Sequence, residues 1–445
     1  MLNIQRKILF CNKIFSTVLF LILCFCAYGI ERSNILSGKV NYSFVAKGFS
    51  KTKVNATIYR TNALISYGDT QYIAYYDPDA NVILGKRKLG TNKWEFHKTQ
   101  YKGNVNDTHN VICIAIDGNG FLHMSWDHHC HKLNYCRSVK PGSLELSDKM
   151  PMTGHKEGVI TYPEFFNLPN GDLLFLYRDG GSGSGNTMLS RYDVKSEKWS
   201  VVQDAFINGE KERCPYTNQI AIDRKGVWHI SWCWRETPAA ETNHDICYAK
   251  SNDDGKTWYK STGEKYELPI TKKNAEVVVS IPQNSELINQ TSNTVDSKGN
   301  PFICQYWKPE GDVTPQFHLI FHNGKEWQVR QITKRKTPFT LAEIGKKPIQ
   351  ISRPKVLIGR NDRVYVIFRD IERGDGVSIA VADAPDYNKW TIEDISNTKL
   401  GPWEPAYDPY LWHRLGVLHI FHQPVEWMDA GKEPTDISVL ECTPK

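Results

Sequence analysis

The stretch IAIDGNGFLHMSW at residues 114–126 sets two short apolar segments on either side of an Asp-Gly-Asn-Gly turn. Glycine adopts positive φ at little cost, and Asp and Asn side chains stabilise tight turns, so this pattern predicts an antiparallel β-hairpin. A second copy, IAIDRKGVWHISW at 220–232, ends in a segment whose aromatic and polar residues alternate. Alternation with a period of two is expected for a strand. The two stretches therefore indicate one repeated hairpin.

Hairpins of the same kind recur along most of the chain. Further copies are FFNLPNGDLLFLY (165–177), NTVDSKGNPFICQYW (293–307), LIGRNDRVYVIFRD (357–370), LWHRLGVLHIFH (411–422) and a weaker QYIAYYDPDANVILGKR (71–87). Strand repeats of about 50 residues are typical of propeller blades, each of which is a small antiparallel sheet. Six clear copies and one weaker copy predict an all-β fold, a seven-bladed β-propeller. Two stacked β-sandwiches are the alternative.

Residues 251–258, SNDDGKTW, match the Asp-box pattern S-x-D-x-G-x-T-W. In this pattern the Asp closes a hairpin by hydrogen bonds and the Trp packs between sheets. The motif is a structural signal that supports a propeller and carries no chemistry of its own. Further tryptophans near hairpin ends are expected to pack in the same way: Trp94, Trp199, Trp327 and Trp390.

The first 29 residues have the layout of a secretory signal peptide. Basic residues, ending at Lys13, precede an apolar run at 18–26 and the small-residue segment Ala27-Tyr28-Gly29. We expect cleavage near Gly29, and hence a secreted or periplasmic protein. A membrane anchor and a lipoprotein are the alternatives, although the apolar run is short for a span and Leu23 before Cys24 fits a lipoprotein signal poorly.

The composition indicates that the chain after the predicted signal peptide is one folded unit. The chain has 445 residues, 40% of them hydrophobic and 23% charged, which excludes general disorder. No linker or charge run divides residues 30–445, and no later segment is apolar enough to cross a bilayer, so we expect a single catalytic propeller domain and a monomer. Three of the 55 basic residues leave with the leader, which reduces the net charge of +6 to +3. Such a balance gives no support for nucleic-acid binding and suits an anionic ligand.

Polar residues that carry chemistry flank three consecutive hairpins. His109, Tyr162 and Tyr216 lie shortly before them, and His129, Arg178 and Arg235 lie shortly after them. Because an antiparallel hairpin returns the chain to its starting end, we expect these six side chains to meet at one mouth of the propeller.

His, Tyr and Arg together suit β-elimination from a uronic acid. The C5 proton becomes acidic when a cation neutralises the carboxylate, a base then removes it, and an acid protonates the leaving oxygen on C4. Arg178 can neutralise the carboxylate with help from His129, while His109 and Tyr162 can serve as base and acid, in an order that stays open. A glycosidase would instead need two opposed carboxylates, and no such pair stands out.

Residues 107–138, 161–186 and 215–236 resemble the BNR-repeat propeller polysaccharide lyases, those acting on ulvan above all. The resemblance implies that His109 and Tyr162 perform the elimination and that His129 and Arg178 engage the carboxylate of an anionic, sulfated polysaccharide. It adds Tyr216 as a pocket residue. Cys130, in DHHCH, departs from the Gly expected there, which leaves the choice between His128 and His129 open. The remaining residues predicted to bind substrate are Asn110, His128, Arg235 and Arg353.

Structural roles are the alternatives for these residues. His109 would then be a turn residue, Tyr162 and Tyr216 would be blade packing, and Arg178 would form an inter-blade salt bridge. A metal held by His128, His129 and His131 is a further alternative.

No cofactor is expected for catalysis. Cys214, Cys233, His244 and Cys247 are a tentative structural zinc site, for which a disulfide plus unpaired thiols is equally compatible. Calcium is less favoured, since no carboxylate-rich loop marks it. Two rival functions remain: a sialidase-like glycoside hydrolase and a non-catalytic carbohydrate-binding propeller.

Overall fold

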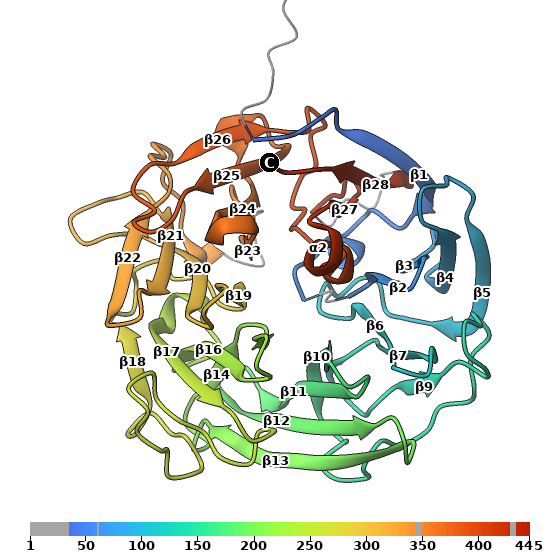
Figure 1. Ribbon diagram of the computed structural model, residues 1–445, viewed down its shortest axis with the longest axis horizontal. Helices are drawn as coiled ribbons and strands as arrows, with labels where there is room; N and C mark the ends of the chain where they lie inside the picture. Colours follow the sequence, from blue (N-terminus) through green and yellow to red (C-terminus); the bar gives the residue numbers. More distant parts are fainter. Residues whose placement is uncertain (1–34, 60–61, 344–348, 428–432) are drawn as a thin grey trace, which may run out of the picture.

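Seven antiparallel sheets form a ring in the computed structural model, which describes residues 35–59, 62–343, 349–427 and 433–445 (Figure 1). The predicted seven-bladed β-propeller is confirmed, and the two-sandwich alternative is excluded. The predicted signal peptide, residues 1–29, lies outside the described residues.

The blades follow one another in chain order around the ring. The first three sheets comprise β2 (Leu64–Tyr67), β3 (Thr70–Tyr76), β4 (Asn81–Lys88) and β5 (Glu95–Lys102); β6 (Ile112–Ile116), β7 (Leu122–Trp126) and β9 (Tyr135–Arg137); and β10 (Ile160–Asn167), β11 (Leu173–Gly181), β12 (Ser184–Asp193) and β13 (Lys198–Asn208), with β8 (His129–His131) added beside β10.

The next three sheets comprise β14 (Cys214–Thr217), β15 (Ala221–Ile222), β16 (Trp228–Arg235), β17 (Asn243–Ser251) and β18 (Glu276–Val279); β19 (Ser292–Val295), β20 (Pro301–Trp307), β21 (Gln316–His322) and β22 (Trp327–Gln331); and β23 (Lys355–Ile358), β24 (Val364–Arg369), β25 (Val377–Ala382) and β26 (Thr391–Asp394). Short 3₁₀ turns lie at Lys53–Asn55, Ala240–Thr242, Leu341–Glu343, Arg360–Asp362 and Ile371–Arg373.

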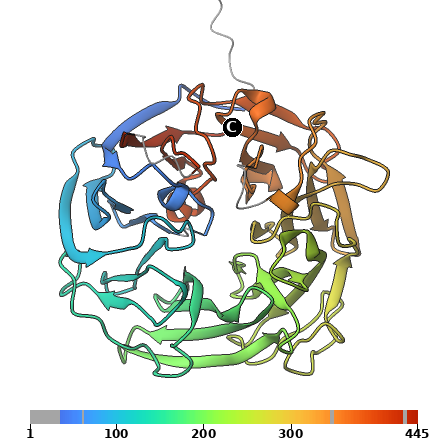
Figure 2. The same cartoon turned by 180° about the vertical axis from the view of Figure 1, so that it is seen from behind.

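The two ends of the described chain close the ring in one blade. β1 (Asn41–Gly48) pairs with β28 (Thr435–Cys442), which in turn pairs with β27 (Leu418–His422). Figures 1 and 2 show these blue and red segments side by side from both faces. Hydrogen bonds between the N-terminal strand β1 and the C-terminal strand β28 therefore close the ring of blades.

Two of the predicted hairpins differ from the structure. The first half of 411–422 belongs to a helix, α2 (Pro409–Leu415), because Asp408 caps its N-terminus by accepting from the Leu411 N–H and Gly416 ends it at φ 67°. The weaker copy at 71–87 forms β3 and β4, and the innermost strand of that blade is the preceding β2.

The Asp box has the structural role expected of it. Asp253 Oδ1 accepts from the Thr257 N–H at 2.9 Å, and Trp258 is fully buried against Phe206, with ring centroids 4.8 Å apart. The side chain thus links two neighbouring blades.

Within the described residues, no helix is both long and apolar enough to cross a membrane.

Candidate active site

The strand registers carry the predicted residues to one end of the ring. Thr161 lies opposite both His129 and Arg178, and Cys214 lies opposite Arg235. Each inner strand leaves this end and each second strand returns to it. The six side chains proposed to converge, from three blades, are in fact brought together here.

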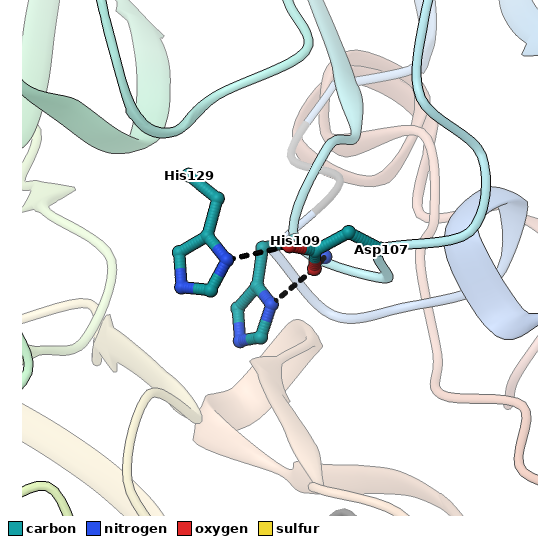
Figure 3. Close-up of side chains that lie close together, drawn as sticks. All are labelled: Asp107, His109 and His129. Carbon is teal, nitrogen blue, oxygen red and sulfur yellow. Dashed lines mark hydrogen bonds and ion pairs between the residues drawn. The ribbon is translucent and has the colours of Figure 1, made fainter.

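Two histidines share one carboxylate at this end (Figure 3). The Nδ1 atoms of His109 and His129 lie 2.6 Å from Asp107 Oδ1 and Oδ2 respectively. The two imidazoles are stacked, with centroids 4.0 Å apart and an angle of 22° between their planes. Asp107 also accepts the backbone N–H of His109 at 3.0 Å, which fixes the loop before β6.

Tyr162 approaches the histidine pair from a distorted strand. Its φ is +56°, a left-handed conformation that is uncommon for a residue other than glycine, and the register of β10 shifts between Thr161 and Glu164. Its ring centroid lies 5.8 Å from that of His109. Strained backbone of this kind persists only where the surroundings hold it, and it is concentrated at functional sites.

Two guanidinium groups meet at one phenol beside Tyr162. Arg178 Nη1 and Arg235 Nη1 donate to the hydroxyl oxygen of Tyr216 at 3.2 and 3.1 Å. Arg178 Cζ lies 4.9 Å from the centroid of the Tyr162 ring. Asn243 and Asn289 accept the remaining bonds of Arg235, at 2.7 and 2.8 Å.

Arg178 and Arg235 differ from the other buried arginines because neither forms an ion pair with a described residue. Arg178 is 6% exposed and Arg235 is 7% exposed. The partners of Arg178 are Gly180 O, Tyr216 and Cys130 Sγ, and none of them is a carboxylate. The other buried arginines pair with carboxylates: Arg87 with Glu441, Arg335 with Asp370, Arg353 with Glu404 and Arg369 with Asp375. Buried charges are normally compensated, so two unpaired guanidinium groups mark a site for an anion.

Electrostatics in the histidine pair follow from its shared acid. Burial alone would raise the pKa of Asp107, but hydrogen bonds from His109 and His129 overcome this and hold the pKa well below its usual range. Burial lowers the pKa of His109, with partial opposition from its hydrogen bond to Asp107. At neutral pH the carboxylate is therefore ionised and His109 is neutral.

Three other residues predicted to bind substrate are buried. His128 is fully buried, its Nε2 accepts the Asn134 N–H at 2.9 Å, and burial lowers its pKa to about 3. Asn110 is also fully buried and donates to Asn104 O. Arg353 lies near the site, with Cζ 5.1 Å from the Tyr59 ring, but its charge is compensated by Glu404 at 2.7 Å. Substrate binding by these three residues stays a prediction. The sequence did not show their burial or the ion pair between distant blades, because neighbouring residues on extended chain face opposite sides.

Cys130, the departure from the expected Gly, has a φ of 59°. This left-handed conformation explains why a glycine suits the position. Its thiol is exposed and lies 3.7 Å from Arg178 Nη2, so the loop still reaches the candidate site.

The four residues of the tentative zinc site do not bring their ligand atoms together in the described part of the chain. Cys247 on β17 lies opposite Trp232 on β16. Cys233 follows Trp232 on β16 and therefore faces the other side of the sheet. His244 is bound to Glu236 and Asp245, at 2.7 and 3.0 Å. No disulfide joins the eight cysteines of the described residues either.

Among the described residues, one group of at least three His, Cys, Asp or Glu side chains has its ligand atoms within 4.8 Å of one another. It consists of Asp107, His109 and His129. Their N···O separations of 2.6 Å are those of hydrogen bonds. Metal–ligand bonds of about 2.0–2.2 Å would hold the two atoms farther apart. The metal proposed for His128, His129 and His131 also lacks a common site, because His128 is buried and bound to Asn134.

Two residues of the cluster were not assigned a role from sequence. Asp107 lies in the quoted motif DTHN, where an acid two residues before a histidine was the available signal. Tyr59 stacks on His109 at 5.8 Å and contacts Tyr162 at 4.8 Å, between ring centroids. It comes from the segment before β2, outside every hairpin motif, and no sequence signal indicates it.

A cavity of about 1260 Å³ lies at the other end of the inner strands. It is lined by hairpin turns that include Asp117, Asn170, Asp223 and Asp296, and by none of His109, Tyr162 or Arg178. This cavity is therefore separate from the cluster that carries chemistry.

Comparison with known proteins places this chain in a family. The sequence profile of the BNR repeat-containing family matches residues 70–335. An ulvan lyase, long isoform, from Alteromonas sp. is 29% identical over 183 residues, covering 30% of this chain and 18% of that protein. An ulvan lyase, long isoform, from Pseudoalteromonas sp. (strain PLSV) is 25% identical over 201 residues, covering 34% and 20%. The matches thus span about a fifth of these relatives.

Two solved structures share the fold over nearly the whole chain. The polysaccharide lyase Uly1 has a TM-score of 0.67 at 16% identity and covers 93% of this chain and 94% of its own. An ulvan lyase of polysaccharide lyase family PL25 has a TM-score of 0.63 at 12% identity, covering 91% and 98%. At these identities the likeness concerns the fold.

Proposed function

The chain belongs to the BNR repeat-containing family and is related to ulvan lyases, and we propose that it is a polysaccharide lyase that cleaves an anionic, uronic-acid-containing polysaccharide by β-elimination. Ulvan is the preferred substrate. Two relationships support this choice: the curated relatives are ulvan lyases, and a structure of the PL25 ulvan lyase is described as bound to -[GlcA(1-4)Rha3S]-.

The single observation that carries the proposal is the pair of buried guanidinium groups without carboxylate partners. Arg178 contacts the ring of Tyr162 and Arg235 contacts the ring of Tyr216. The Tyr162 ring in turn contacts that of His109. A uronate carboxylate would supply the missing negative charge. Neutralising that carboxylate is also the step that makes the C5 proton removable.

The proposed reaction uses residues on one face of the sugar. Arg178, with His129, holds the carboxylate and stabilises the charge that develops when C5–H breaks. His109 and Tyr162 divide the two proton transfers: one accepts the C5 proton, and the other protonates the C4 oxygen as the C4–O bond breaks. A C4=C5 double bond forms, and the products are an unsaturated uronate end and a free hydroxyl.

The rival functions receive less support. A glycoside hydrolase would use two carboxylates, whereas the acid in contact with these rings, Asp107, is engaged by two histidines. A purely binding propeller would have no need for a strained Tyr162 beside a neutral histidine. We further propose that the protein acts as a secreted or periplasmic monomer without a catalytic cofactor.

One assay separates these functions. Purified protein mixed with ulvan is expected to generate the ultraviolet absorbance of an unsaturated uronate. Reducing ends without that absorbance would indicate hydrolysis, and binding without either product would indicate a lectin-like role.

Variants locate the activity at the candidate site. His109→Ala and Tyr162→Phe are each expected to abolish the absorbance while the thermal melt stays near wild type. His155→Ala, which removes an exposed histidine paired with Asp204, is the matched control and is expected to keep full activity. Full activity in both site variants would refute the assignment.

A further inference from the structure

Both histidines of the candidate site are bound to one acid, Asp107. Each of its oxygens lies 2.6 Å from one imidazole Nδ1. We propose that Asp107 is a positioning residue that holds His109 and His129 with their Nδ1–H groups toward its carboxylate, so that both Nε2 atoms face the substrate.

The tautomers follow from the chemistry of the acid. An ionised carboxylate has no proton to donate, so the ring nitrogen at 2.6 Å must be the donor. The low pKa of Asp107 keeps it ionised across the neutral range. Neutral His109 therefore carries its proton on Nδ1 and a lone pair on Nε2. Figure 3 shows the second nitrogen of each ring on the side away from the carboxylate.

The same contact orients both histidines. With a lone pair on Nε2, His109 is prepared to accept a proton. His129 has the same Nδ1 contact, and its ring is stacked on that of His109 with centroids 4.0 Å apart. One acid thus orients two imidazoles side by side.

Two substitutions distinguish positioning from simple structural support. Asp107 Oδ1 accepts both the ring and the backbone N–H of His109, so an amide in Asp107→Asn is expected to keep its oxygen there and turn its NH₂ toward His129. His129 should then change to the Nε2–H tautomer while His109 does not. Asp107→Ala releases both rings.

The decisive measurement is the ring nitrogen signature of each histidine in ¹⁵N-histidine-labelled protein without substrate. We expect Nδ1–H at His109 in the wild type and in Asp107→Asn, and loss of this preference in Asp107→Ala. Finding Nε2–H at His109 in the wild type, or no change in Asp107→Ala, would overturn the inference. These outcomes do not depend on lyase activity.

The activity measurement rests on the proposed function. Asp107→Ala is expected to lower kcat by roughly 10²- to 10³-fold, in the range of a lost general base, with little change in KM. Asp204→Asn removes a carboxylate from an exposed histidine, His155, and should leave kcat unchanged. A wild type without lyase activity would refute the proposed function alone, whereas an active Asp107→Ala variant would refute the positioning role.

Discussion

Arg178 and Arg235 donate to the same acceptor, the hydroxyl oxygen of Tyr216, at 3.2 and 3.1 Å, and in the part of the chain that the structure describes neither guanidinium contacts a carboxylate. Two like charges are thereby held next to each other and largely away from water. This arrangement costs stability in the free protein and favours an anion in the complex. The relationship leads to predictions that separate stability from activity.

The first prediction concerns stability. Arg178→Met removes a buried charge that has no acidic partner, so the free energy of unfolding should stay within about 1 kcal/mol of wild type or increase. Arg353→Met is the contrast, because it leaves buried Glu404 without its guanidinium and should cost about 3–5 kcal/mol. Urea unfolding measures both. Equal losses in the two variants would contradict the difference in pairing.

The second prediction concerns anion binding without catalysis. Free glucuronate should raise the melting temperature of the wild-type protein, because a ligand that binds only the folded state stabilises it. The increase should be absent in Arg178→Met and should remain in Arg373→Met, whose arginine is partly exposed and paired with Asp394. A similar increase in all three proteins would place the anion elsewhere.

The third prediction concerns the shared phenol. Tyr216→Phe leaves two buried donors without their acceptor, and we expect a loss of about 1–3 kcal/mol in unfolding free energy. The guanidinium groups should also become less well placed, with kcat/KM reduced by roughly 10-fold or more. Tyr192→Phe removes a hydroxyl bound to Arg137 outside the site and serves as the control. Unchanged kcat/KM in Tyr216→Phe would show that the phenol does not place the arginines.

The fourth prediction concerns pH. The charged and titratable groups that face His109 are Asp107, His129 and Arg178. The rings of Tyr59 and Tyr162 also contact it. Burial lowers the pKa of His109 below the ordinary 6.5, and Asp107 partly raises it. A base is active when deprotonated, so the acid limb of kcat/KM should have its midpoint below 6.5.

In Asp107→Asn that midpoint should move lower still, because the contribution that raises the pKa of His109 is removed. Rate measurements from acid to neutral pH test both statements. A midpoint that moves upward in the variant would contradict the sign of the effect of Asp107.

The fifth prediction concerns backbone strain at Cys130, whose φ is 59°. Cys130→Gly should relieve a left-handed conformation and change the unfolding free energy by about 0 to +1 kcal/mol, since the flexibility of glycine in the unfolded chain offsets part of the gain. Cys130→Ala keeps the strain and should gain nothing. Activity should survive in Cys130→Gly, and its loss would indicate that the thiol contact with Arg178 matters.

Turn chemistry and strand periodicity were sufficient to predict the propeller. Asp, Asn and Gly at the hairpin turns, with alternating apolar strands, act locally, and the seven-blade count followed from their repetition. The stretch 411–422 was one exception, because Asp408 and Gly416 cap a helix where the repeat suggested a strand. Helix caps lie at single positions, so they are easily overlooked within a repeat pattern.

The candidate site was predictable only as far as strand direction allows. An antiparallel hairpin returns to its starting end, so residues before and after it, such as Tyr162 and Arg178, were expected to meet. Burial of His128 and Asn110 was not foreseen, because one step along an extended chain exchanges the inner and outer faces.

The sequence by itself determined an all-β repeat, the blade count, and which histidines, tyrosines and arginines lie at one end. Tertiary structure alone decided which of those charges are compensated. Arg353 meets Glu404 from 51 positions away, whereas the partners of Arg178 and Arg235 among the described residues are a phenol, amide oxygens and one thiol. The reason is that closing the ring sets neighbours between blades that are distant in sequence, and these neighbours, not the local motif, decide whether a buried charge is neutralised or left for a ligand.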